Sequence, residues 1–148
     1  MDDLAARVAA AMWAEDTASA GLGMRLVAVG EGTARLEMTV REDMVNGHGI
    51  AHGGFVFTLA DSAFAFACNS RNRLTVAAGL TVDFLAPAHR GDVLSADALE
   101  VSLAGRTGVY DIVVTNRAGA RVALVRGRSA RLGDRTVIPA PAGEAATR

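Results

Sequence analysis

The sequence has few of the residues that would assign it to several common classes of protein. Its 148 residues include one cysteine, Cys68, and three prolines, and aromatic residues make up 5% of the chain. A single cysteine excludes an intrachain disulfide and any zinc site built from several cysteines. Acidic and basic residues nearly cancel, to a net charge of −1, so no basic excess points to nucleic acid.

Long hydrophobic runs are also missing. Asp61, Asn69 and Asp83 interrupt the apolar stretches before these reach the ~20 residues of a membrane-spanning helix, so no membrane location is expected. The acids Asp2 and Asp3 stand where a secretory signal would carry basic residues, which favours a cytoplasmic location. With 51% hydrophobic and 21% charged residues, the chain has the composition and length of one globular domain.

Hydrophobic periodicity predicts the order of the secondary structure elements. Apolar residues from 4 to 13 recur at three- and four-residue spacing, which predicts an amphipathic helix that ends near residues 21–23. Residues 55–69 contain no glycine or proline and are apolar on nearly all sides, which predicts a long, buried helix. Stretches with strand composition, separated by turn signals, cover residues 24–29, 34–40, 76–85, 93–103, 107–116 and 121–132.

This order of elements favours one particular architecture. A single long apolar helix among strands is covered only if the sheet curls around it. We therefore expect an α+β fold of the hotdog type, a curled antiparallel sheet of about five to six strands wrapped around one central helix. The domain would span residues 1–133, with a flexible tail at 134–148. Because pairing with a second copy protects exposed sheet edges, we expect at least a dimer.

The segment before the long helix carries the chemistry. Residues 41–54 lose all periodicity, contain Asn46 and end in His52-Gly53-Gly54. The glycines leave the first helical N–H groups accessible at the positive end of the helix dipole, where they suit an oxyanion hole. Asp61 lies two turns inside the helix, and a carboxylate there can act as a general base or as a nucleophile.

The spacing of these residues bears on subunit organisation. Gly53 and Asp61 are eight positions apart. Along a helix that is roughly 12 Å at 1.5 Å per residue. A single carbonyl cannot contact both groups of one chain, so a shared carbonyl would require two subunits and an active site at their interface. Asn46 could orient water or the carbonyl, and His52 could hold the loop by hydrogen bonding.

Four segments carry a family resemblance: His52-Gly53-Gly54, Leu59-Ala60-Asp61, residues 81–87 and Gly91-Asp92. They resemble the bacterial phenylacetic-acid-degradation thioesterases of the hotdog superfamily. The resemblance implies hydrolysis of acyl-CoA to free acid and CoA, with phenylacetyl-CoA and ring-hydroxylated relatives among the substrates. It implies that Asp61 is the base or nucleophile, Gly53 the oxyanion donor and Asn46 a positioning group. It also implies a homotetramer of paired dimers that uses no metal and no cofactor.

Arginines are expected where the phosphates of coenzyme A bind, and the candidates are Arg90, Arg106, Arg126 and Arg128. His48 and His52 lack a third ligand, so no metal site is predicted. Cys68 lies among apolar residues, which favours a small buried side chain over a nucleophile.

Two other functions stay open at the level of sequence. One is a hotdog dehydratase or hydratase that acts on acyl-CoA through His52 and an acid. The other is a non-catalytic module that binds acyl-CoA. The sequence also leaves open which acyl group is preferred, and whether Asp61 activates water or forms an anhydride.

Overall fold

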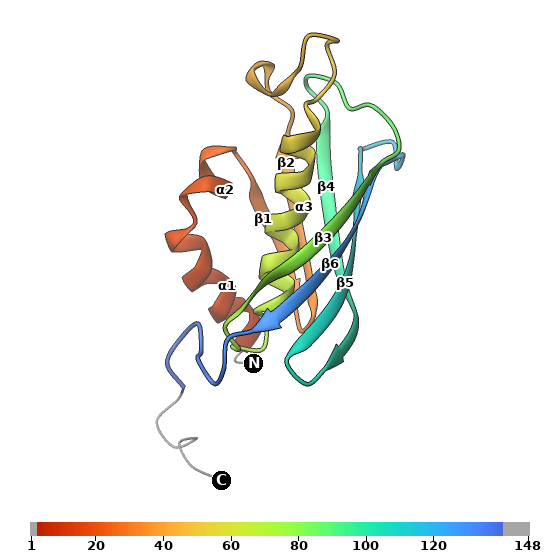
Figure 1. Ribbon diagram of the computed structural model, residues 1–148. Coiled ribbons are helices and arrows are strands. Elements are labelled where there is room, and N and C mark those ends of the chain that lie inside the picture. The colour runs from red at the N-terminus through yellow and green to blue at the C-terminus, as the bar shows by residue number, and fades with distance from the viewer. Residues whose placement is uncertain (1–2, 141–148) are drawn as a thin grey trace.

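Six strands form one sheet that curls around a single long helix (Figure 1). The computed structural model describes residues 3–140. The strands are β1 (Arg25–Gly30), β2 (Thr33–Thr39), β3 (Thr75–Phe84), β4 (Val93–Ala104), β5 (Thr107–Thr115) and β6 (Arg121–Arg131). Their order in the sheet is β1-β2-β4-β5-β6-β3, and every neighbouring pair is antiparallel. The predicted hotdog fold and its six strands are confirmed.

The helices are α1 (Leu4–Glu15), α2 (Thr17–Gly21), the short 3-10 helix η1 (Glu42–Met44) and α3 (Gly53–Cys68). Periodicity did not predict the break between α1 and α2. The cause is Asp16, whose carboxylate accepts hydrogen bonds from the Ser19 N–H at 2.9 Å and the Ser19 hydroxyl at 2.6 Å. This side chain caps a new helix, and the Ser19 hydroxyl then lies 2.8 Å from that of Ser62 on α3.

Helix α3 packs its small and aromatic residues into the concave face of the sheet. Ala60, Ala63 and Phe64 are at most 1% exposed. The Phe64 ring lies edge-on to Tyr110 of β5, with centroids 5.4 Å apart. It also lies over Gly127 of β6, where an added Cβ would come within 3.0 Å of the ring. The sheet therefore packs closely against α3, and these contacts fix the orientation of the helix.

One face of α3 is left uncovered beside the edge strand β3. Gly54 is exposed, and Thr58, Asp61 and Ala65 are only partly buried. These positions follow three- and four-residue spacing and so form one stripe along the helix. The prediction that α3 is buried on most sides is confirmed, and this stripe is the side that the single chain leaves partly open. The side of α3 facing α1 is covered, with the Trp13 and Phe66 rings 6.1 Å apart.

The sheet has two edges, β1 and β3. Within residues 3–140, β3 pairs only with β6. Its ends carry exposed apolar side chains, with Val76 42% and Phe84 54% exposed. A long edge strand with apolar side chains is a site for pairing with another strand.

The segment after β6 is held to the body of the domain as far as the structure describes it. The Asn72 carboxamide oxygen accepts from the N–H groups of Val137 and Ile138, at 3.0 and 2.9 Å. The Leu74 N–H donates to the Arg135 carbonyl at 2.9 Å. Residues 141–148 lie outside the described residues, so the flexible tail stays a prediction. No helix within residues 3–140 is long and apolar enough to cross a membrane.

Candidate active site

The first turn of α3 is capped by His52. Its Nδ1 accepts a hydrogen bond from the Gly54 N–H at 3.0 Å, and its carbonyl accepts from the Phe55 N–H at 3.0 Å. The Gly53 N–H makes no hydrogen bond within residues 3–140. The cap therefore uses the second donor of the helix and leaves the first, from Gly53, available at the positive end of the helix dipole.

Gly53 faces a surface cavity of about 540 Å³. The lining includes Asn46, Ile50, Gly53, Val56, Phe84 and Leu85. A Cβ added to Gly53 would lie 2.8 Å from Cζ of Phe84, so glycine makes room for the ring. Gly53, the predicted oxyanion donor, and Asn46 thus line one cavity together with the Phe84 ring.

Asn46 holds the loop through its side-chain oxygen. Its Oδ1 accepts from the N–H groups of His48 and Ile50, at 2.9 and 3.4 Å. Its Nδ2 makes no hydrogen bond in the part of the chain that the structure describes. The acceptor of this carboxamide is therefore occupied and its donor is available, which suits contact with a carbonyl or water oxygen.

Asp61 carries a carboxylate without a partner. It lies on the uncovered stripe of α3, partly buried, and forms no hydrogen bond or ion pair with any residue from 3 to 140. Burial removes water from the carboxylate and raises the pKa of Asp61 above its ordinary value. A desolvated carboxylate with no structural role is typical of a catalytic base or nucleophile.

The other candidates for chemistry are less suited to it. Burial raises the pKa of Cys68 to about 12, so the thiol stays protonated and is a poor nucleophile. Within residues 3–140, no three His, Cys, Asp or Glu side chains gather in the way that a metal ion requires.

The four arginines predicted to contact CoA lie in three separate places. Arg90 is near the loop of the cavity, with Nη1 3.6 Å from Oε1 of Glu42. On β6, Arg126 pairs with Asp111 through bonds of 2.7 and 2.8 Å, and the Arg128 guanidinium covers the backbone of Gly79. Arg106 lies in the turn between β4 and β5, near the C-terminal end of α3 and away from Gly53.

Residues 48–123 match the family described as "Thioesterase superfamily". The chain belongs to the thioesterase superfamily. This superfamily member is 46% identical to the acyl-coenzyme A thioesterase PaaI of Escherichia coli, over 83% of this chain and 88% of that protein. The predictions of a thioesterase and of a likeness to the phenylacetic-acid-degradation proteins are therefore confirmed.

Solved structures give the same result. The structure of the E. coli PaaI protein from the phenylacetic acid degradation operon matches with a TM-score of 0.87 at 44% identity, over 88% of this chain and 95% of that chain. A Streptococcus mutans protein solved with acetyl-CoA, smu.793, matches with a TM-score of 0.73 at 27% identity, over 76% of this chain and 91% of that one.

Sequence reasoning missed a group of arginines at the C-terminal end of α3. Arg71, Arg73 and Arg131 line a cavity together with Arg106. They come from two segments about sixty positions apart in the chain, brought together by the pairing of β3 with β6. No local pattern marks such a group, because its members share neither a helix face nor a strand.

Proposed function

We propose that this thioesterase hydrolyses acyl-CoA thioesters to free acid and CoA, with phenylacetyl-CoA and related aryl or medium acyl groups as substrates. The proposal rests on the presence, on one helix, of a carboxylate without a partner at Asp61 and an N–H without an acceptor at Gly53, among the residues that the structure describes. The relatives add support, since the E. coli protein is named for acyl-CoA hydrolysis and the S. mutans protein binds acetyl-CoA.

The chemistry follows from these two groups. The Gly53 N–H receives the thioester oxygen as it becomes negative, aided by the helix dipole. Asp61 deprotonates a water that attacks the carbonyl carbon, or attacks that carbon itself to give an anhydride that water then cleaves. The C–S bond breaks and CoA leaves as a thiolate, which needs no strong general acid. The free Nδ2 of Asn46 donates to the carbonyl or to the attacking water.

The site needs two subunits under this proposal. Gly53 and Asp61 stand at the start and in the middle of α3, roughly 12 Å apart along its axis. A second copy that pairs along β3 brings the N-terminus of its α3 toward Asp61. The partly open stripe on α3 and the free β3 edge lie on the same side, so one partner covers both.

A homotetramer requires a further contact between dimers. The outer part of β4 supplies an apolar surface, with Leu99 58%, Val101 53% and Leu103 48% exposed. Large exposed apolar groups close together are typical of protein interfaces. We assign this surface to the contact between dimers. The cytoplasmic location expected from the sequence stays a prediction.

Arg90 is the arginine best placed for the phosphates of CoA. It follows His89, which pairs with Ile50 of the cavity lining. Its only ion pair within residues 3–140 is the long, exposed one with Glu42. Contacts from Arg106, Arg126 and Arg128 stay predictions. The dehydratase alternative gains nothing from the structure, because Nδ1 of His52 is occupied by the helix cap.

The test is the release of free thiol from a panel of phenylacetyl-, hydroxyphenylacetyl-, benzoyl-, butyryl- and octanoyl-CoA. We expect hydrolysis by the wild type and a loss of about 10³-fold or more in kcat for Asp61→Asn, because the base or nucleophile is gone. Glu15→Gln, which removes an exposed carboxylate of α1, is the matched control and should keep full activity. Wild-type protein that is folded but hydrolyses none of these thioesters would refute the proposal.

A further inference from the structure

A second cavity lies at the opposite end of α3 from Gly53. Its volume is about 230 Å³, and it is bordered by Cys68 at the end of α3, by the segment leading into β3, by the β4–β5 turn and by β6. Four arginines are among its lining residues: Arg71, Arg73, Arg106 and Arg131. The cavity is smaller than the roughly 300–1,000 Å³ of sites that enclose a whole drug-sized ligand. It therefore fits one end of a molecule.

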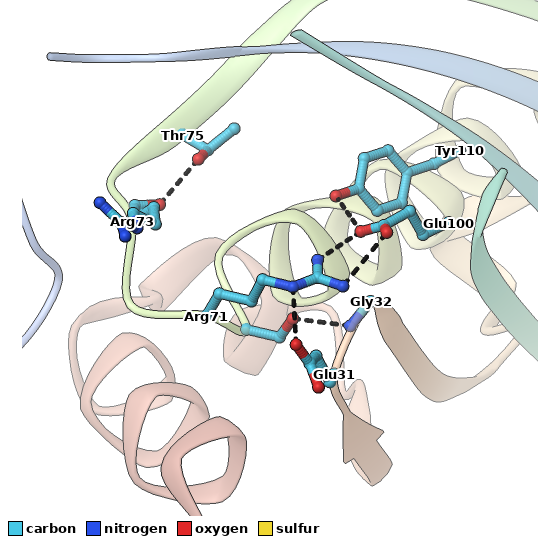
Figure 2. Close-up of polar contacts among 8 residues, drawn as sticks. Glu31, Gly32, Arg71, Arg73, Thr75, Glu100 and Tyr110 are labelled. Carbon is cyan, nitrogen blue, oxygen red and sulfur yellow. Dashed lines mark hydrogen bonds and ion pairs between the residues drawn. The ribbon is translucent and has the colours of Figure 1, made fainter. Parts of the chain in front are cut away.

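Two of these arginines are occupied by neighbouring carboxylates. Arg71 donates to Oε1 of Glu31 at 2.9 Å and makes a two-pronged contact with Glu100, which also accepts from the Tyr110 hydroxyl at 3.0 Å (Figure 2). Arg131 donates to Asp134 and to the Gly133 carbonyl. These contacts fix the walls of the cavity.

The other two arginines of the cavity, Arg73 and Arg106, have no side-chain partner among the described residues. The side chains of Arg73 and Arg106 form no hydrogen bond and no ion pair within residues 3–140, although both line the cavity. Figure 2 shows Arg73 on the segment that leads into β3, apart from the Arg71–Glu100 cluster. Two unpaired guanidinium groups at one small cavity favour an anion.

A serine in the same cavity adds a hydrogen-bond donor. Ser129 of β6 is among the lining residues, and its hydroxyl forms no hydrogen bond with the residues that the structure describes. It lies against Gly108, where an added Cβ would be 2.7 Å from Oγ. A hydroxyl at the wall of the cavity can donate a hydrogen bond to an anion bound there.

The cavity continues the uncovered stripe of α3 on which Asp61 lies. Cys68 is seven positions after Asp61, so it faces the same side two turns along, roughly 10 Å away. Between them stands Ala65, a small and partly exposed residue. An acyl group whose thioester is at Asp61 can run past Ala65 and place its far end in the cavity.

We propose that this cavity binds a carboxylate at the end of the acyl group distal to the thioester, so that the enzyme prefers acyl-CoA substrates with a terminal carboxylate. The proposal rests on the proposed thioesterase function. Arg73 and Arg106 pair with the carboxylate, and the Ser129 hydroxyl donates a hydrogen bond to it. Water hydrolyses the thioester C–S bond near Asp61, and the products are a dicarboxylate and the thiol of CoA.

A phosphate of CoA fits this position less well. The pantetheine arm between the thioester sulfur and the nearest phosphate spans about 15 Å when extended, judged from the ~3.5 Å covered by three backbone bonds. That arm is long enough to reach the cavity, but the cavity is too small for the nucleotide attached to the phosphate.

The test compares two thioesters of equal size, 4-carboxyphenylacetyl-CoA and its neutral amide, 4-carbamoylphenylacetyl-CoA. We expect the wild type to prefer the carboxylate by about tenfold or more in kcat/KM, the effect of hydrogen bonds to a charged group. The double variant Arg73→Gln/Arg106→Gln should lose this preference. Arg73→Gln alone should reduce the preference severalfold but hydrolyse phenylacetyl-CoA within about twofold of the wild type. Ser129→Ala should reduce the preference severalfold. Arg117→Gln, in the turn before β6, is the charge-matched control.

Equal rates for the two thioesters in the wild type would overturn the proposal while leaving the thioesterase function intact. So would a rise in KM shared by all CoA thioesters in the double variant, together with weaker binding of free CoA, because that result would assign the cavity to a CoA phosphate. If no thioester is hydrolysed, calorimetry with free 4-carboxyphenylacetate still tests the cavity. Binding that the double variant loses would support the proposal, and no binding by the wild type would overturn it.

Discussion

The Asp61 carboxylate, the proposed base or nucleophile, is affected by burial alone. No cation or hydrogen-bond donor within residues 3–140 stabilises its charge, and burial raises its pKa. The folded chain therefore holds the proton on Asp61 more tightly than the unfolded chain does. The ionised form needed for catalysis is then present at neutral pH at some cost in stability.

This cost predicts that Asp61→Asn stabilises the protein. The pKa of Asp61 is higher in the folded than in the unfolded protein. Protonated Asp61 therefore favours folding at a pH below the unfolded pKa, and this contribution to the free energy of unfolding is lost as the pH rises through the folded pKa. The variant should therefore melt at a higher temperature than the wild type at pH 7, and the gain should disappear near pH 3. Thermal unfolding at both pH values measures this. A lower melting temperature at pH 7 would show that the carboxylate has a stabilising partner.

The same shift predicts the acid limb of the pH–rate profile. Hydrolysis requires ionised Asp61, so kcat/KM should fall as pH decreases, with an apparent pKa above the ordinary range of an aspartate. Initial rates of thiol release between pH 4 and 9 give this value. A profile that stays flat down to pH 4 would contradict Asp61 as the titrating base.

At the residue scale, the sequence predicted the positions of the main groups but not their partners. Gly53 and Asp61 lie on α3 as the sequence predicted, because both positions follow from one local pattern, a glycine pair that opens an apolar helix. Their catalytic roles stay predictions. The pairing of Arg126 with Asp111, and the absence of a partner for Arg73, depend on strand register and distant turns. Local sequence carries no signal for such contacts.

At the scale of elements, the His52 cap links the stability of α3 to the direction of the Gly53 N–H. His52→Ala removes the bond to the Gly54 N–H and should cost about 1 kcal/mol in the free energy of unfolding. It should also lower kcat, because the first turn that aims the oxyanion donor is loosened. His52→Asn, which supplies a capping oxygen in place of the imidazole nitrogen, should restore the stability. Denaturant unfolding and thiol release measure both effects. Equal stability of the Ala variant and the wild type would contradict the capping role.

The Arg71–Glu100 contact ties the turn after α3 to β4. Hydrogen bonds from Arg71, the largest cause, hold the pKa of Glu100 below its usual range. Because the pKa of Glu100 is lower in the folded protein, ionised Glu100 stabilises the fold at a pH above its unfolded pKa. This stabilisation is lost as the pH falls through its folded pKa. Glu100→Gln should therefore cost about 2 kcal/mol at pH 7 and progressively less in acid. Urea unfolding of the wild type and the variant at pH 7 and pH 3 checks this. If their free energies of unfolding differ by the same amount at both pH values, the ionic contact is not the cause of the difference.

Most elements were predictable because their periodicity is local. Strands β4, β5 and β6 lie within a few residues of their predicted ranges, since alternating side chains face the core and the outside. The end of α1 was missed because a single side chain, Asp16, starts a second helix there. The uncovered face of α3 was missed because an apolar helix shows the same pattern whether its own sheet or a second chain covers it.

At the scale of the whole molecule, the proposed mechanism makes the single chain a carrier of two half-sites. Gly53 and Asp61 lie on one helix and cannot approach each other. Within residues 3–140, the free β3 edge and the partly open stripe of α3 are available to a second copy. The proposed mechanism therefore requires an oligomer in which each site takes its oxyanion donor from one subunit and its carboxylate from the other.

Gly53→Pro removes the N–H donor required by this arrangement and adds a Cβ that meets Phe84. Proline is well tolerated at the first position of a helix, where its missing N–H is not used by the helix itself. The His52 backbone, at φ −61° and ψ 131°, suits a residue before proline. Gly53→Ala is the matched control, because it adds the same Cβ against Phe84 but keeps the N–H.

The most direct measurement mixes Gly53→Pro protein with Asp61→Asn protein, each inactive alone, and follows thiol release after subunit exchange. Random exchange places half of the subunits in mixed dimers with one intact site of two, so about a quarter of wild-type activity should return. Recovery at that level would establish a thioesterase site shared between subunits. No recovery, with exchange confirmed by mass spectrometry of tagged subunits, would contradict it.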